Sequence, residues 1–150
     1  AQERSVLKML RSVLRGEYAG LLGDLTLPPG RASTVINTFV RNGVSLEMCV
    51  TRLHALLANR GNSLLVPVLS MPLPDGRCRV MAQKPLETSG KGERRLAQET
   101  WEVFESFILK HPHLWLWAYK HFRYRPMEPA RDYPGYALQS VEFETMRLET

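Results

Sequence analysis

The chain of 150 residues carries 20 Lys and Arg against 15 Asp and Glu, a formal net charge of +5, and 44% of its residues are hydrophobic. This length is typical of one domain with a substantial core, and this balance of apolar and charged residues excludes an intrinsically disordered chain. The positive charge is too small to indicate nucleic-acid binding by itself.

The sequence also lacks the local patterns of membrane-spanning, secreted and metal-binding proteins. No run approaches the roughly 18 apolar residues that cross a bilayer, and no signal-peptide pattern opens the sequence, so we expect any membrane contact to be peripheral. The two cysteines, Cys49 and Cys78, are not spaced as metal ligands, which favours a reducing compartment. No zinc, phosphate-loop or other cofactor motif is recognisable, and we expect no cofactor.

The first residues predict a helix followed by a buried strand. The helix is predicted from Ser5 to Gly16, where apolar residues recur on one helical face. That face comprises Val6, Met9, Leu10, Val13 and Leu14. The short apolar run 18–22 then predicts a buried strand that ends at Asp24. An acid at the carboxyl end of such a strand is a typical ligand contact in α/β sheets, so Asp24 is a candidate binding residue. The alternative is that Asp24 caps the turn before the bend at residues 28–30.

The next residues predict a strand and a helix. Residues 34–40 are rich in β-branched side chains, which favours a strand. Ser45 is a suitable N-cap for a helix that would end at Gly61. Its apolar face would place Cys49 in the core and leave His54 near the polar edge.

Residues 64–69 form a continuous apolar run, which predicts a central strand with Pro67 at an edge or bulge. A turn is predicted at residues 74–76, whose sequence is Pro-Asp-Gly. Residues 77–82 would then return as the antiparallel partner.

A long helix is predicted beyond the polar connection at residues 84–92. Its apolar positions run from Leu96 to Ile108 with helical spacing. The acidic residues on its other side are Glu93, Glu99, Glu102 and Glu105.

In the last residues, 127–150, acidic side chains outnumber the two basic ones, Arg131 and Arg147. Alternation of Val141 and Phe143 with acidic neighbours predicts a short edge strand there. The sequence as a whole predicts an α/β fold with a mixed open β-sheet flanked by helices. We divide it into a domain at residues 1–126 and an acidic tail at 127–150.

The segment from His111 to Pro126 is the most unusual part of the chain, because it combines aromatic and basic residues with no acid. Its tryptophans and cations are Trp115, Trp117, Lys120, Arg123 and Arg125. One interpretation is that the aromatic residues pack at the margin of a core and the cations form a solvated rim. The other is that the segment meets an anionic partner, either a phosphorylated lipid headgroup or a nucleic acid.

This segment resembles the carboxy-terminal signature of the late acyltransferases of lipid A biosynthesis, the lauroyl and myristoyl transferases. The resemblance rests on Trp117, Phe122, Arg123, Arg125 and Pro126. The family usually has His-Arg-Arg before the Phe, whereas this chain has Tyr-Lys-His at residues 119–121.

The resemblance continues upstream, from about residue 5 to residue 126. The order of helix, apolar strand and Asp24 is similar to that of the family, as are the strand ending in Phe39 and the Val-Pro pair at Pro67. It implies the second half of a glycerolipid acyltransferase-like fold. It also implies that the segment after Asp24 helps to form the acceptor side of the site.

The family's catalytic motif, a His with an Asp or Glu five positions later, is absent from this sequence. The residues five positions after the four histidines are Asn59, Leu116, Ala118 and Pro126. In the family the carboxylate orients the imidazole that deprotonates the acceptor hydroxyl. We therefore identify no catalytic residue here. Either the chain is a carboxy-terminal fragment whose catalytic half lies upstream, which its start without Met favours, or it is a degenerate relative.

The resemblance implies transfer of a fatty acyl group from an acyl carrier protein thioester to a hydroxyl of a phosphorylated glycolipid, at the cytoplasmic face of the bacterial inner membrane. Arg123 and Arg125 would hold anionic groups of the substrate or the membrane surface, with Trp115 and Trp117 at the interface. We also expect Lys120 and Asp24 to bind substrate, and a missing amino-terminal half or a partner chain to complete the domain. The alternative is an inactive binding module or subunit that uses the same segment for anionic lipid or, less favoured, nucleic acid.

Overall fold

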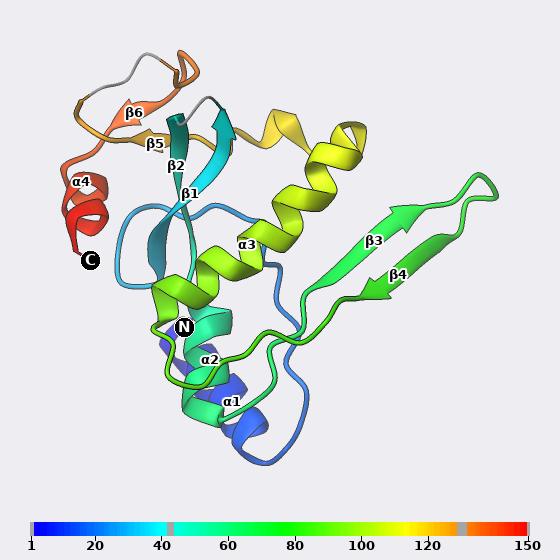
Figure 1. Cartoon of the computed structure of the whole chain (residues 1–150). Helices are drawn as coiled ribbons and strands as arrows, with labels where there is room; N and C mark the ends of the chain where they lie inside the picture. Colours follow the sequence, from blue (N-terminus) through cyan, green and yellow to red (C-terminus); the bar gives the residue numbers. More distant parts are fainter. Residues whose placement is uncertain (1, 42–43, 129–131, 150) are drawn as a thin grey trace.

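The computed structural model describes residues 2–41, 44–128 and 132–149. Over these residues it contains four α-helices and three separate two-stranded sheets, as Figure 1 shows. The predicted α/β class is confirmed. A single open sheet is not formed, because each strand pairs with one neighbour in the order β1-β2, β3-β4 and β5-β6. None of the helices in this part of the chain is long and apolar enough to cross a membrane.

The body of the molecule is built on the antiparallel hairpin of β1 (Ser33–Arg41) and β2 (Val44–Thr51). The strand predicted at 34–40 is confirmed. The helix predicted from Ser45 is wrong over its first half, because these residues pair with β1 in register, Ile36 opposite Met48. The ladder of backbone hydrogen bonds overrides the apolar spacing that had favoured a helix. The helix α2 begins only at Leu53 (Leu53–Gly61).

The long helix α3 (Glu93–Lys110) is confirmed and lies across β1 (Figure 1). Trp101 is almost fully buried, and its Nε1 donates a hydrogen bond of 2.6 Å to the hydroxyl of Thr38. That hydroxyl donates at 2.9 Å to Glu105, whose other oxygen accepts from the backbone N–H of Phe39 at 2.9 Å. The sequence pattern predicts Glu105 on the side of α3 opposite its apolar residues. It faces β1 instead, because it satisfies polar groups at an irregularity where Phe39 has a φ of 50°.

Two clusters of buried side chains lie on opposite faces of the β1–β2 hairpin. The larger one, under α3, comprises Ile36, Met48, Val50, Ala97, Trp101, Ile108, Trp115 and Phe122. The smaller one comprises Val35, Cys49 and Phe143. The placement of Cys49 in the core is thus confirmed, and its burial raises the pKa of the thiol to about 11.

The edge strand predicted around Val141 is wrong, because residues 141–148 form the helix α4 (Val141–Leu148). Ser140 caps it by accepting a hydrogen bond of 3.2 Å from the N–H of Phe143. Phe143 is completely buried against the hairpin, and Arg147 of the same helix pairs with Glu47 of β2 at 2.7 Å. The connection to α4 runs through β5 (Tyr124–Arg125) and its parallel partner β6 (Leu138–Gln139).

The third pair, β3 (Val68–Pro72) and β4 (Cys78–Ala82), projects away from the body (Figure 1). The predicted turn and antiparallel return are confirmed, and Leu73 and Arg77 close the turn with a backbone hydrogen bond of 2.8 Å. The strand predicted at 64–69 is formed only from Val68 onward, and it belongs to this two-stranded hairpin and not to the centre of a sheet. Pro67 lies just before the strand, where its carbonyl accepts a hydrogen bond of 2.9 Å from the N–H of Gln83.

The helix α1 (Gln2–Leu14) begins before Ser5 and packs near the end of α2. At Gly61 an added Cβ would overlap Val13, so this approach requires a glycine. The buried strand predicted at 18–22 is wrong. These residues are extended but pair with no described strand, and the side chain of Tyr18 is fully exposed.

The hydrogen bonds at Thr38 predict a measurable stability cost. In Thr38→Val the hydroxyl is lost, so Trp101 Nε1 and one oxygen of Glu105 lose their partner in a buried place. We expect the free energy of unfolding to fall by about 1–3 kcal/mol in urea titrations. Thr38→Ser keeps the hydroxyl and should lose clearly less. A Thr38→Val variant that is as stable as the wild type, or that loses less than Thr38→Ser, would contradict a stabilising role for these hydrogen bonds.

Candidate functional site

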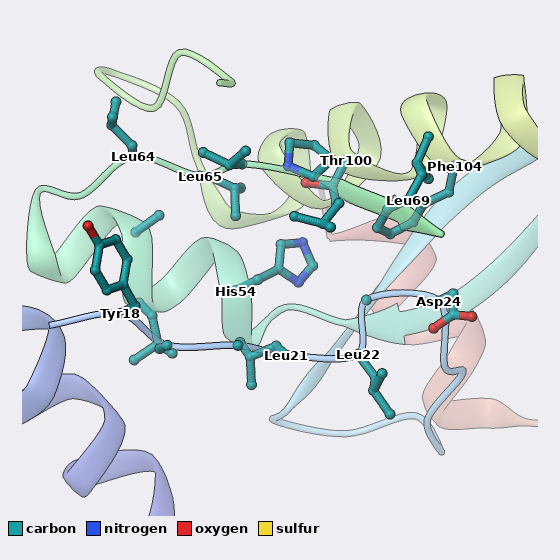
Figure 2. A pocket seen from close by; sticks show the side chains of 18 of the residues that line it. Tyr18, Leu21, Leu22, Asp24, His54, Leu64, Leu65, Leu69, Thr100 and Phe104 are labelled. Atoms are coloured by element: carbon teal, nitrogen blue, oxygen red, sulfur yellow. The ribbon is translucent and has the colours of Figure 1, made fainter. Parts of the chain in front are cut away.

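The described residues enclose a mainly apolar groove with a volume of about 960 Å³. Its two walls are the extended segments 16–24 and 63–70, and its floor is formed by α2 and α3 (Figure 2). The floor residues are His54, Leu57, Ala58, Thr100, Phe104, Phe107 and Ile108. The groove can therefore surround an elongated apolar ligand.

The first wall is held against α3 at Gly23. A Cβ at this position would lie only 2.8 Å from the ring of Phe104, so a larger residue would push the wall away from the helix. Asp24 follows directly and lies at one end of the groove (Figure 2). Its charge is felt by the buried His121, whose pKa is lowered mainly by burial, while Asp24 and a hydrogen bond to the carbonyl of Leu116 oppose that shift.

His54 is the one imidazole on the groove floor at α2. The side chain is only 8% exposed, and neither Nδ1 nor Nε2 has a hydrogen-bond partner among the described residues. Figure 2 shows its ring pointing into the space between the wall at Leu21 and the wall at Leu65. Burial lowers the pKa of His54 to about 4, so the ring is neutral. The expected position at the polar edge is wrong, because the helix begins at Leu53 and the residue lies in its buried first turn.

Trp115 links the groove to the aromatic and basic segment. It lines the groove and is buried, with its ring stacked on His121 at a centroid distance of 3.9 Å. Trp117 meets it edge-on at 4.6 Å but is 52% exposed, and its Nε1 donates to the carbonyl of Pro112. The short helices η1 (Pro112–Leu114) and η2 (Trp117–Tyr119) set these positions.

The cations of this segment lie outside the groove lining. Lys120 and Arg123 are exposed, each over an aromatic ring, Tyr136 at 5.7 Å and Tyr119 at 5.5 Å. With the exposed Leu116 and Trp117 they form what we call the aromatic–basic surface, defined by Leu116, Trp117, Lys120 and Arg123.

Arg125 is differently placed. It is half-buried in β5 and donates hydrogen bonds to the carbonyls of Ala137 and Pro126. Of the six predicted binding residues, the structure thus brings Asp24 and Trp115 to the groove. It places Trp117, Lys120 and Arg123 on the adjoining surface, and Arg125 with the connection to β6.

Sequence reasoning missed the groove and its buried His54. The apolar runs 18–22 and 64–69 indicated the walls, but they were interpreted as strands of one sheet. The signal for His54 was its place among Leu53, Ala55 and Leu57, where a polar side chain interrupts a nearly continuous apolar run.

The burial of His54 predicts a pH-dependent stability. The unfolded chain binds a proton at His54 below the ordinary pKa of 6.5, whereas the folded chain does not until the pH is about 4. Stability should therefore fall as the pH falls through this window, by up to about 3 kcal/mol. Urea titrations between these two pH values should show a weaker fall for His54→Leu than for the wild type. The exposed His113→Leu variant serves as the control, and a fall unchanged in His54→Leu would contradict the neutral buried imidazole.

Comparison of the chain with models of known protein families and with curated proteins finds no match.

Proposed function

We propose that this chain forms the carboxy-terminal part of an acyltransferase that transfers a fatty acyl group from acyl carrier protein to a hydroxyl of a phosphorylated glycolipid. The observation that carries the proposal is the apolar groove beside the aromatic–basic surface, joined to it through Trp115. An acyl chain in the groove would leave water at about 0.8 kcal/mol for each CH₂ group.

The aromatic–basic surface supports attachment to the cytoplasmic face of an anionic inner membrane. Leu116 is 64% exposed beside the half-exposed indole of Trp117, and both are side chains that favour the interface of a bilayer. Lys120 and Arg123 are exposed on the same segment, where they would meet phosphates of the headgroups. A guanidinium is suited to bidentate phosphate contact.

Within the proposal, residues 1–150 hold substrates and do not supply the catalytic base. His54 is followed by Asn59 at the place of the family's carboxylate, and burial keeps its imidazole from taking up a proton. Asp24 lines the groove, and in this proposal it would contact the acceptor hydroxyl near the acyl end. The His and Asp or Glu of the dyad must then come from outside residues 1–150.

The groove predicts binding of fatty acyl chains with a length dependence. In competition against a fluorescent fatty acid, each added CH₂ should tighten binding by roughly fourfold until the groove is filled. Leu65→Asp places a charge in the wall and should weaken binding by at least tenfold. Val80→Asp, an identical charge change on the exposed β4, should not. Affinity independent of chain length, or equal loss in both variants, would contradict an acyl site in the groove.

The aromatic–basic surface predicts binding to anionic vesicles. The chain should float with phosphatidylglycerol vesicles and not with phosphatidylcholine vesicles. The double variant Lys120→Glu, Arg123→Glu should bind at least tenfold more weakly, at about 1 kcal/mol for each basic residue near the surface. The control is the double variant Arg79→Glu, Lys84→Glu, which has the same change of charge and should bind like the wild type. Arg79 lies in β4 and Lys84 follows it.

Two further outcomes separate the proposal from its alternatives. Salt-sensitive binding of oligonucleotides without vesicle binding would assign the surface to nucleic acid and contradict the proposal. Transfer is measured on the gene product that contains residues 1–150, with an acyl carrier protein thioester and a phosphorylated glycolipid. If the protein binds fatty acyl chains and anionic vesicles but transfers no acyl group, it is an inactive lipid-binding module instead.

A further inference from the structure

His54 is a polar side chain for which the fold supplies no partner. Both ring nitrogens are sealed from solvent and lack a hydrogen bond among the described residues, while the ring lies on the floor of a mainly apolar groove. An unsatisfied buried polar group costs about 1–3 kcal/mol. Leucine at this position of α2 would avoid that cost. Packing alone therefore does not explain why a histidine stands at this position.

The surroundings of His54 restrict what could pair with it. The charged side chains that line the groove are Glu17 and Asp24, in the first wall, and Glu17 is already paired with Arg15. Figure 2 shows the ring of His54 between Leu21, Leu65 and Thr100. The hydroxyl of Thr100 is engaged with the carbonyl of Leu96 at 2.8 Å. A charged group of a ligand would be unpaired here, so an uncharged group is favoured.

A neutral imidazole offers one N–H donor and one lone pair. A hydroxyl group both donates and accepts, so it can serve whichever nitrogen faces it. An ether oxygen or a carbonyl can only accept. Access requires the walls to separate locally, and the wall at residues 18–22 is tied into no strand of the described chain.

We infer that the groove binds a single-chain amphiphile that carries an uncharged hydroxyl group, and that His54 recognises this hydroxyl. The inference deepens the acyl-chain site of the proposed function but does not depend on acyl transfer. The alkyl part of the ligand lies along Leu21, Leu57 and Leu65, and the hydroxyl replaces the missing partner of His54.

The experiment compares a long-chain primary alcohol, its methyl ether and the fatty acid of equal length, each competing with the fluorescent fatty acid. The wild-type chain should bind the alcohol roughly tenfold more tightly than the ether, because only the alcohol can donate a hydrogen bond to the ring nitrogen of His54 that carries the lone pair. His54→Leu should bind alcohol and ether equally while it still binds the alkyl chain. His54→Gln, which keeps a donor and an acceptor, should restore part of the preference.

A second readout reports on His54 directly. Addition of the alcohol to ¹⁵N-labelled wild-type chain should shift the imidazole nitrogen signals of His54, and addition of the ether should not shift them in the same way. Equal affinities for alcohol and ether in the wild type, or a preference that survives in His54→Leu, would overturn the inference while leaving the acyl site intact. A preference for the fatty acid that is lost in His54→Leu would overturn it as well, because the site would then recognise an anion. Absence of binding by all three compounds would reject the acyl site itself.

Discussion

The structure depends on one contact, the attachment of α3 to the irregular end of β1. Glu105 satisfies the hydroxyl of Thr38 and the N–H of Phe39, and Trp101 donates to the same hydroxyl. Trp101 and Glu105 are four residues apart and therefore share one face of the helix. Because polar groups and a large ring are fixed together, α3 cannot slide or turn on the hairpin without leaving them unpaired. The neighbouring face, with Thr100 and Phe104, is thereby held as the floor of the groove.

The groove walls are much less constrained than its floor. The first wall pairs with no described strand and contacts α3 closely at Gly23, whereas the second is paired with β4 from Val68 and bridged at Leu65 and Leu86. Apolar side chains along both walls are exposed, among them Tyr18, Leu22, Leu64 and Val68. Such a surface favours an apolar partner, whether an alkyl chain or another polypeptide segment. The wall at residues 18–22, which pairs with no described strand, is the side of the groove with the fewest backbone constraints.

Elements with strong local signals were predictable from the sequence. The helix at 93–110 has an unbroken apolar stripe, and Pro-Asp-Gly at 74–76 fixes a turn whose strands follow from it. Residues 45–51 and 141–148 were assigned to the wrong element, because apolar side chains at short spacing fit either period over so few residues. The pairing of β2 with β1, and the cap at Ser140, decided between them. The runs 18–22 and 64–69 show that an apolar run predicts contact with other apolar groups, but does not identify the element that makes the contact.

The sequence predicted those residues of the candidate site that stand at the end of a segment or in a segment of unusual composition. Asp24 and Trp115 do reach the groove, whereas His54 was missed because its environment depends on where β2 stops and α2 starts. Trp115 gives the two halves of the site a physical connection. One ring lines the groove, stacks on His121 and meets the exposed Trp117 edge-on. In the proposed function, a ligand that shifts Trp115 would shift Trp117 through this contact, and by linkage a membrane bound at Trp117 would change the affinity of the groove by the same factor.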